Sequence, residues 1–405
     1  MKKNKLINLV LLISVISGTF LVLEAFIENY LITQTPVKFH FALPAGLAVL
    51  AQSSKTGRIP ENYIALAGDS YAHGKGDWLL EISPDSNDAF HSAHVLQNLT
   101  EHDVISFGKS GASNIKGWVR DPIARYQFIH DNIDDSIKHP KIILAYFYAG
   151  NDLLENVQQL HESFIPKYGE TALNDDDAWN DFFLTNIEER KVGPFSGIDN
   201  NLGWLPRATF KVLKNELKTK KVGWELGDIH IQQTGKFNSV WVNDKEIKIP
   251  DNIQAPTLDL TSAETELGFL AFSKSLEYLK NFFNKSQIIV VYIPSVIESY
   301  SRMSEKLSII NIRTKNKYIE EIYTSSQLMQ RSNEIADRVK KISTSFGLSF
   351  IDTRADIRAA STQQLIHGPV DWLHFNRKGY EVLAQSISCG MAKQNILETS
   401  RCPEN

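Results

Sequence analysis

The sequence is poor in cysteine and close to neutral, and both features narrow what the protein can be. Two of its 405 residues are cysteines, Cys389 and Cys402, so we expect no cysteine scaffold and no C-x-x-C metal or redox motif. The 43 basic and 47 acidic side chains leave a formal net charge of -4, which gives no overall attraction for nucleic acid. No His and carboxylate cluster has the spacing of metal ligands. We therefore expect a globular protein with no metal or other cofactor and no nucleic-acid partner.

Two common catalytic motifs are also missing. Gly108-Lys109-Ser110 has the form of the end of a phosphate-binding P-loop, but the position that needs the first glycine of that loop is Asp103. No Gly-x-Ser-x-Gly sequence is present, so the nucleophile elbow of the α/β-hydrolase fold is not expected. These absences argue against a P-loop nucleotide site and against an α/β-hydrolase.

One long apolar run lies at the N-terminus. Three lysines within the first five residues precede an uncharged segment at 6–23, which is long enough to cross a membrane as a helix. The positive flank predicts that this end stays cytoplasmic and that the chain after Glu24 lies outside. The length of the run, with no Ala-x-Ala-like site after it, favours an uncleaved anchor over a cleaved signal peptide. We predict a single-pass protein of the inner (cytoplasmic) membrane with a periplasmic catalytic domain, where the two cysteines could pair.

The rest of the chain alternates between buried strands and helices. Short apolar runs closed by small or polar residues are typical of strands that are buried on both faces, and strands that alternate with helical patterns predict an α/β fold with a doubly wound parallel sheet. The strands are expected at 63–67, 104–107, 141–148, 287–294 and 348–352. The helices are expected near 89–99, 121–137, 263–283, 325–343 and 377–391, with 299–324 as a loop-rich interval.

The alternation stops for about 110 residues, at 153–262. This is far longer than an ordinary connection, so we predict an inserted lid subdomain. A basic helix at 207–221 is typical of a solvated helix face, with contact to an anionic membrane surface or glycan as the alternative. The pattern at 239–249 predicts a β-hairpin. Tryptophans of the insert could stack on sugars, although burial in a core is the more common role of such residues. They are Trp179, Trp204, Trp224 and Trp241.

Polar residues follow the predicted strands. Ser70 comes after the first strand and Asn151 after the third, and Asp371 and His374 stand three residues apart beyond the last one. The carboxyl ends of parallel strands lie at one edge of a sheet, so we expect these side chains near one another. A serine nucleophile needs a base to take its proton and a carboxylate to orient that base. His374 and Asp371 are of the right types for these two roles.

Four blocks of sequence together resemble a known family. The blocks are Gly68-Asp69-Ser70, Gly108-x-Ser110-Gly111, Gly150-Asn151-Asp152 and Asp371-x-x-His374. They resemble the four blocks of the SGNH (GDSL) hydrolase superfamily and occur in the family's order. The resemblance covers about 61–152 and 263–391, but neither the N-terminal run nor the insert. The third block of the family usually reads Gly-x-Asn-Asp, so the glycine at position 150 is displaced by one.

The resemblance implies a fold and a set of roles. The fold is a flavodoxin-like α/β/α sandwich with a five-stranded parallel sheet. Ser70 is then the nucleophile, His374 the base and Asp371 its partner. The oxyanion hole is formed by the backbone N–H groups of Ser70 and Gly111 and by the side chain of Asn151.

The resemblance also implies an SGNH/GDSL-type serine ester hydrolase or acyltransferase. The anchor and the tryptophans favour O-acyl groups, above all O-acetyl groups, of an envelope glycan as the substrate. The alternatives are a lysophospholipase or thioesterase that acts on lipid acyl chains, and a non-catalytic polysaccharide-binding or assembly protein. The expected parts of the chain are a membrane anchor (1–30), a juxtamembrane connector (31–60), the hydrolase domain (61–152 and 263–392), the insert (153–262) and a C-terminal tail (393–405).

Overall fold

The structure is a computed structural model of the whole chain. It describes all residues except 1, 38–39, 41–42, 44, 82–91, 192–208, 210–213, 215–234, 315–316 and 403–405.

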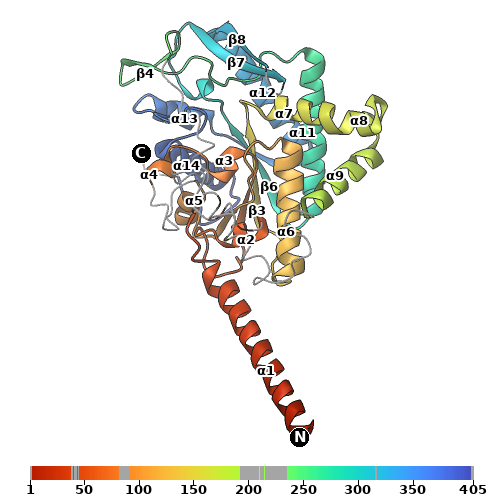
Figure 1. The fold of residues 1–405 in the computed structure, drawn as a ribbon. Helices are drawn as coiled ribbons and strands as arrows, with labels where there is room; N and C mark the ends of the chain where they lie inside the picture. Colours follow the sequence, from red (N-terminus) through yellow and green to blue (C-terminus); the bar gives the residue numbers. More distant parts are fainter. Residues whose placement is uncertain are drawn as a thin grey trace.

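Five parallel strands form one central sheet in the order β2-β1-β3-β6-β9 (Figure 1). Numbered by their occurrence along the chain, these strands have the order 2-1-3-4-5, which is that of the flavodoxin-like doubly wound folds. The predicted α/β fold with five parallel strands is therefore confirmed. The strands are β1 (Ile64–Ala67), β2 (Val104–Ser106), β3 (Ile142–Tyr148), β6 (Gln287–Ile293) and β9 (Ser349–Asp352).

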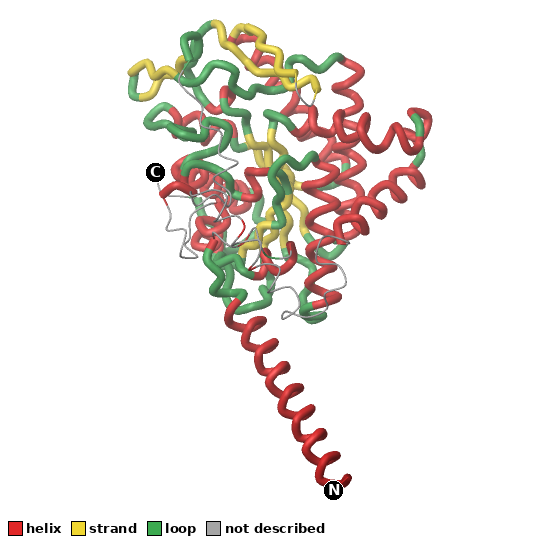
Figure 2. Tube along the Cα trace, in the orientation of Figure 1, coloured by secondary structure: helices red, strands yellow, loops and turns green. Residues whose placement is uncertain are grey.

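Helices cover both faces of this sheet and give three layers (Figures 1 and 2). Along β1, Ala65 and Ala67 pack on one helical layer, and Ile64 and Leu66 pack on the other. This alternation follows from the two-residue period of a strand, and burial of both faces explains why the strands are apolar throughout. One layer contains α6 (Asp121–Asn132), α11 (Ser262–Phe282) and α12 (Ser325–Ser345), and the other contains α5 (Ser92–Thr100), α13 (Arg354–Ser361) and α14 (Arg377–Lys393).

The interval 299–324 differs from the expected loop. After a short turn, η7 (Ile297–Ser299), it forms an antiparallel hairpin of β7 (Lys306–Thr314) and β8 (Lys317–Thr324). Leu307 and Ile309 of this hairpin are buried. The interval contains many lysine and glutamate residues, so its alternating pattern was too weak to indicate strands.

The first half of the insert continues one helical layer. It contains α7 (Asp152–Gln159), η4 (Leu160–Phe164), α8 (Ile165–Tyr168), η5 (Glu170–Asn174) and α9 (Asp176–Lys191). α7 packs against α11, and α9 packs against α6. Trp179 is buried against Phe164 and Phe183, so this tryptophan is part of the core and cannot stack on a sugar.

The second half of the insert is described only in part. The predicted β-hairpin is present as β4 (Ser239–Val242) and β5 (Lys245–Lys248). The predicted basic helix at 207–221 lies almost wholly outside the described residues, as do Trp204 and Trp224. A lid role for the insert stays a prediction.

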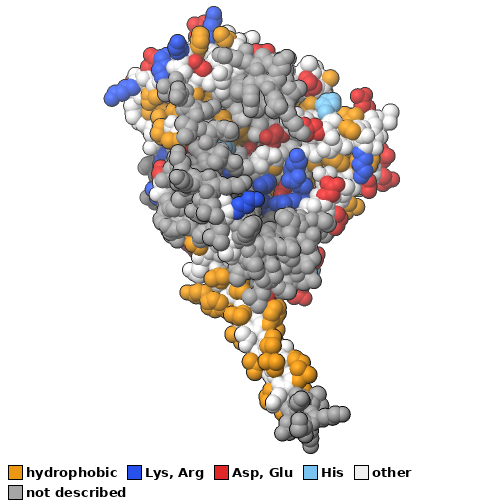
Figure 3. Space-filling view, in the orientation of Figure 1, with side chains coloured by type: hydrophobic (Ala, Val, Ile, Leu, Met, Phe, Trp, Pro, Cys, Tyr) orange, Lys and Arg blue, Asp and Glu red, His pale blue; other side chains and the backbone are white. Residues whose placement is uncertain are grey.

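The two ends of the chain agree with the features expected from sequence. α1 (Lys2–Phe26) is followed by η1 (Ile27–Leu31), and its segment Ile7–Phe26 has a mean hydropathy of 2.3 with none of it buried. The helix extends away from the domain and exposes apolar side chains (Figure 3). It is long and apolar enough to cross a membrane. At the other end, a disulfide joins Cys389 of α14 to Cys402.

Candidate active site

Ser70 lies where β1 ends and a short helix begins. β1 ends at Ala67, and α3 (Ser70–His73) follows after Gly68 and Asp69. The Asp69 carboxylate caps this helix by accepting the backbone N–H of Tyr71 at 2.9 Å. The Ser70 side chain is nearly buried, at 8% exposed, and its hydroxyl donates a long hydrogen bond of 3.4 Å to Asp69. The serine therefore lies at the carboxyl end of a central strand, as predicted.

Gly68 is required by close packing at this point. A Cβ atom at Gly68 would lie 2.9 Å from the Cβ atom of Tyr146 on the neighbouring strand, and the backbone φ angle of Gly68 is +155°. Both facts favour glycine. The chain can thus turn sharply out of the sheet and place the next side chains at its edge.

Asp371 and His374 form a tight pair in the loop before α14. His374 Nδ1 lies 2.6 Å from Asp371 Oδ2, and Asp371 Oδ1 accepts the backbone N–H of Leu373 at 2.9 Å. Burial opposes ionisation of Asp371, but the hydrogen bond and charge of His374 outweigh it and lower the pKa of this carboxyl. An ionised carboxylate can only accept hydrogen bonds, so Nδ1 must be the donor. This tautomer leaves Nε2 of His374 as a proton acceptor.

Tyr71 brings this loop to the serine. Its hydroxyl donates to the carbonyl of Leu373 at 2.8 Å, and its ring lies 5.6 Å from that of His374 and 5.1 Å from that of Phe375. The candidate base therefore packs on the residue next to Ser70. Burial raises the pKa of Asp69 to about 6. The hydrogen bond from the N–H of Tyr71 and the charge of His374 both act to lower this pKa.

Two more contacts hold the same segments together. The Asp77 carboxylate accepts the backbone N–H groups of Val370 at 2.9 Å and of Asp371 at 2.5 Å. The hydroxyl of Tyr380 donates to the carbonyl of Lys75. These bonds join residues 293 to 305 positions apart in the chain. Our sequence reasoning missed these positioning residues, because no local pattern identifies a carboxylate that caps a distant loop.

Ser70 and His374 are linked through Tyr71, which follows Ser70 in the chain and packs against the ring of His374. Both residues are described, and no hydrogen bond joins them in this structure, since the Ser70 hydroxyl donates to Asp69. Catalytic hydrogen bonds are often long or misaligned in an enzyme without substrate. The structure thus brings the serine, the histidine and the aspartate to one place and leaves the final contact unmade.

Gly111 lies in the loop between β2 and η3 (Ile115–Arg120). Its φ angle is +65°, and a Cβ atom there would meet nothing within 4 Å, so its backbone borders open space. The preceding residue, Ser110, shares a 3.1 Å hydrogen bond with Nδ1 of His73 in α3. A Cβ atom at Gly108 would lie 2.4 Å from the backbone nitrogen of His73. This loop therefore runs directly against the helix that carries Ser70.

Asn151 follows β3 and is the N-cap residue of α7. Its side-chain nitrogen donates to Oε1 of Glu155 at 3.0 Å, while its side-chain oxygen is buried without a hydrogen-bond partner among the described residues. A Cβ atom at Gly150 would lie 2.5 Å from the ring of Tyr148. The ring of Tyr148 thus gives a physical reason for glycine at this displaced position.

Buried carboxyl groups surround Asn151. Burial raises the pKa of Glu155 to about 8, with a further rise from the charge of Asp69. Burial, followed by the charges of Asp69 and Glu155, also raises the pKa of Asp152. Asp152 Oδ2 accepts hydrogen bonds from the backbone N–H of Tyr148 at 3.0 Å and from Nδ2 of Asn114 at 2.9 Å. Glu155 is therefore largely uncharged at neutral pH, which suits a site that must hold a developing negative charge.

Comparison with known proteins gives few matches. No family model matches the sequence, and no curated protein matches it. Among solved structures, a catalytic mutant of an acetylxylan esterase from Geobacillus stearothermophilus has a TM-score of 0.34 and 13% identity, and the match covers 85% of this chain and 99% of that chain. An extracellular lipase from Streptomyces rimosus has a TM-score of 0.33 and 12% identity, with 81% and 98% covered.

These similarities are too low to support an argument about function. The chain has the fold that the resemblance to the SGNH hydrolases implies, as its strand order shows. The chemistry must be argued from the geometry of its own residues. Among the described residues, no group of three or more His, Cys, Asp or Glu side chains is placed to hold a metal ion.

Proposed function

We propose that this protein is a serine ester hydrolase or O-acyltransferase with Ser70 as its nucleophile. The single observation that carries the proposal is the 2.6 Å pair of Asp371 and His374, which packs on the residue next to Ser70 at the carboxyl edge of the sheet. A buried, ionised carboxylate that fixes the tautomer of a histidine beside a serine is the arrangement that nucleophilic catalysis requires.

The first half-reaction transfers the acyl group to the enzyme. The Ser70 oxygen attacks the acyl carbonyl carbon while its proton passes to Nε2 of His374. The carboxylate of Asp371 stabilises the imidazolium that forms. When the tetrahedral intermediate collapses, the bond to the leaving alcohol breaks and the proton of Nε2 goes to that alcohol. In the second half-reaction, water or a sugar hydroxyl attacks the acyl-serine by the same route.

The negative oxygen of the intermediate needs donors on the other side. The backbone N–H groups of Ser70 and Gly111 are assigned to it, together with the side chain of Asn151. The Asn151 nitrogen carries two hydrogens, and its bond to Glu155 uses one of them. The second hydrogen remains for the oxyanion.

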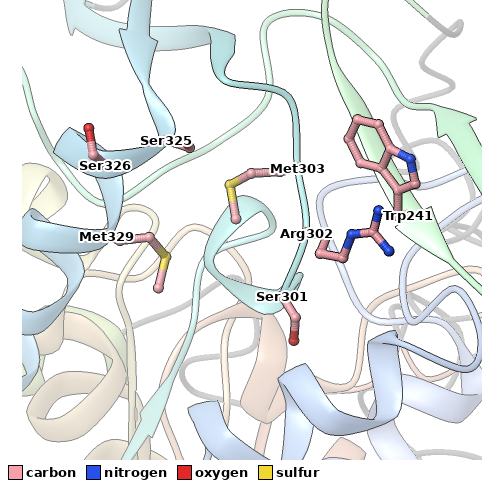
Figure 4. Close-up of a pocket in the computed structure, with 7 residues that line it drawn as sticks. All are labelled: Trp241, Ser301, Arg302, Met303, Ser325, Ser326 and Met329. Carbon is pink, nitrogen blue, oxygen red and sulfur yellow. The ribbon is translucent and has the colours of Figure 1, made fainter. Parts of the chain in front are cut away.

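An envelope glycan is our proposed carrier of the ester, with acetyl as the acyl group. The apolar helix α1 would hold the domain at the outer face of the inner membrane. A pocket of about 480 Å³ lies between β4, the segment after η7 and the start of α12 (Figure 4). Trp241 and Arg302 line it, with the guanidinium 5.7 Å from the indole ring. An aromatic ring beside polar groups is a surface to which sugars bind.

Removal of the serine hydroxyl tests the mechanism. We expect Ser70→Ala to lower kcat on p-nitrophenyl acetate by about 10⁶-fold, because no other group can form the acyl-enzyme. A Ser70→Ala protein with wild-type activity would end this proposal. Labelling with a fluorophosphonate probe separates an enzyme from a binding protein, since only an activated serine reacts. Absence of label on folded wild-type protein would favour the non-catalytic alternative.

The molecule that carries the ester and the group that accepts the acyl need separate measurements. Incubation with an O-acetylated envelope polysaccharide, followed by mass spectrometry of free acetate and acetylated products, distinguishes hydrolysis from transfer. A series of p-nitrophenyl esters distinguishes acetyl from lipid substrates. A rate that peaks well above acetyl would favour a lysophospholipase or thioesterase.

A further inference from the structure

Several positively charged side chains gather beside the candidate oxyanion hole. Arg120, Arg125 and Arg190 all contact the carboxylate of Asp121, at 2.5, 3.8 and 2.9 Å. Asp121 is fully buried, and although burial opposes its ionisation, the three arginines lower its pKa. Three guanidinium groups therefore share this one carboxylate.

Lys116 adds a further positive charge close to α7, because Asn114, the residue before η3, donates its backbone N–H to Oδ1 of Asn156 in α7 at 3.0 Å. Lys116 lies in η3, which follows the loop of Gly111, and it is partly buried. Its backbone N–H donates to the carbonyl of Ser113 at 3.0 Å, but its ammonium group makes no hydrogen bond or ion pair with a described residue. Burial, followed by the charge of Arg120, lowers the pKa of Lys116. Three acids act to raise it: Glu155, Glu162 and Asp121.

Two of the three acids that act on the pKa of Lys116 do little to neutralise it. Burial raises the pKa of Glu155 to about 8, so this carboxyl is mostly protonated at neutral pH. The carboxylate of Asp121 is already shared by three arginines. The third acid, Glu162, acts through its charge to raise the pKa of Lys116. An ammonium group that is partly removed from water and lacks a partner is available for an anion from solution.

This positive charge flanks both candidate oxyanion donors. On one side, Lys116 acts on Glu155, which holds the side chain of Asn151. On the other side, the guanidinium of Arg125 donates to the carbonyl of Gly108 at 3.0 Å, in the loop that carries Gly111. Figure 3 shows Lys and Arg side chains gathered near the middle of the face in view.

We propose that Lys116 binds an anionic group of the substrate, so that the ester is carried by an acidic glycan. This inference rests on the proposed esterase or acyltransferase function. A sugar carboxylate or a sugar phosphodiester next to the acylated hydroxyl would supply the missing partner of the ammonium. The positive charges of the arginine cluster would attract such a chain and raise its local concentration at the site.

A matched pair of small substrates tests the inference. Mono-O-acetylated methyl glucuronoside and mono-O-acetylated methyl glucoside differ in one carboxylate. With the full-length protein in detergent at low salt, we expect kcat/KM to be about tenfold higher for the glucuronoside, because one ion pair at a partly buried site has about this effect. The ratio should fall as salt is added.

Variants of Lys116 assign the preference to its charge. Lys116→Gln should reduce the ratio to about twofold or less, mainly through KM, whereas Lys116→Arg should retain most of it. Lys340→Gln removes an exposed lysine of α12 and should leave the ratio unchanged. Thermal unfolding of each variant checks that the fold is intact.

Each other outcome has a defined meaning. Equal kcat/KM for the two sugars in the wild-type protein would overturn the inference and leave the proposed function standing. An equal loss on both sugars in Lys116→Gln would also overturn it, since the lysine would then act through Glu155. No turnover of either sugar, with no fluorophosphonate label, would overturn the function and the inference together. If an O-acetylated sugar phosphodiester loses its acetyl group faster than the glucuronoside does, the anion site is supported and its ligand is a phosphate.

Discussion

The two sides of the candidate site are built differently. On the side of the proposed base, three tertiary contacts of Tyr71, Asp77 and Tyr380 lock the loop before α14 onto the segment after β1. On the oxyanion side, Gly111 borders open space, and the Asn151 side chain has one hydrogen bond to a described residue, Glu155. The base is thus held by several neutral and charged contacts. The oxyanion donors depend on the open loop of Gly111 and on the carboxyl group of Glu155, whose pKa is raised to about 8.

This difference suits the two tasks. A general base must stay in one tautomer and one orientation throughout the reaction, so a rigid setting serves it. The oxyanion donors must admit a substrate and then accept a charge that exists only in the transition state. An open face at Gly111 provides access, and a mostly protonated Glu155 near Asn151 avoids repulsion of that charge.

Of the two sides, the rigid side of the base is expected to show the larger effect. Asp371→Asn should lower kcat on p-nitrophenyl acetate by about 10⁴-fold, because an amide nitrogen facing Nδ1 selects the wrong tautomer of His374. KM should change little. The measurement is steady-state kinetics on protein whose unfolding temperature is unchanged. A loss of less than tenfold would show that the Asp371–His374 pair is structural.

The open side is expected to contribute less. Asn151→Ala should lower kcat by about 10²- to 10³-fold, the usual result of removing one oxyanion donor. Asn186→Ala, on α9, removes an amide that bonds only the preceding turn of its helix and serves as the control. If both variants keep wild-type kcat, the oxyanion hole must lie elsewhere.

Asp77 tests whether tertiary contacts really make the base side rigid. Asp77→Asn offers one acceptor oxygen in place of two, so one of the N–H groups of Val370 and Asp371 loses its partner. We expect a loss of about 1–3 kcal/mol in stability and about a tenfold lower kcat. Asp337→Asn, at an exposed position of α12, is the matched control. A stability change without any change in kcat would separate Asp77 from the positioning of His374.

The smallest effect concerns the charge of Glu155. Its folded pKa is raised to about 8 by burial, so the folded state keeps a proton that the unfolded state releases near pH 4.3. The stability contribution of this group is therefore present below about pH 4.3 and lost as pH rises towards 8. Above pH 8 the new carboxylate lies beside Asn151, and we expect kcat to fall a few-fold.

A neutral analogue isolates this effect. Glu155→Gln keeps an acceptor for the Asn151 amide and cannot ionise. Its unfolding temperature should depend less on pH between 4.3 and 8, and its kcat should not fall above pH 8. The measurements are thermal unfolding and kcat as functions of pH. Identical profiles for the variant and the wild-type protein would show that Glu155 does not tune the oxyanion side.

Local sequence was sufficient for the strands of the sheet. Runs such as Ile142–Tyr148 are apolar at every position, and the structure buries all seven residues. A segment buried on both faces carries its whole signal in itself, so its type and limits can be predicted without any partner. The hairpin β7–β8 was missed for the opposite reason, since its polar residues hide a half-buried pattern.

The polar residues at the ends of the strands also followed from sequence. Because parallel strands present their carboxyl ends at one edge, Ser70, Asn151 and Asp371 could be expected near one another. Their fine placement could not. It depends on Tyr71, Asp77 and Tyr380, which reach residues 293 to 305 positions away.

By itself the sequence determined the fold class, the N-terminal apolar helix and the residue types at the edge of the sheet, because these depend on hydrophobic period and on strand direction. Only the tertiary structure decided which tautomer His374 adopts, how Asn151 is held by Glu155, and where the positive charge of Lys116 lies. Burial and pairing set those properties. They arise when distant segments exclude water together, and no local stretch of sequence contains them.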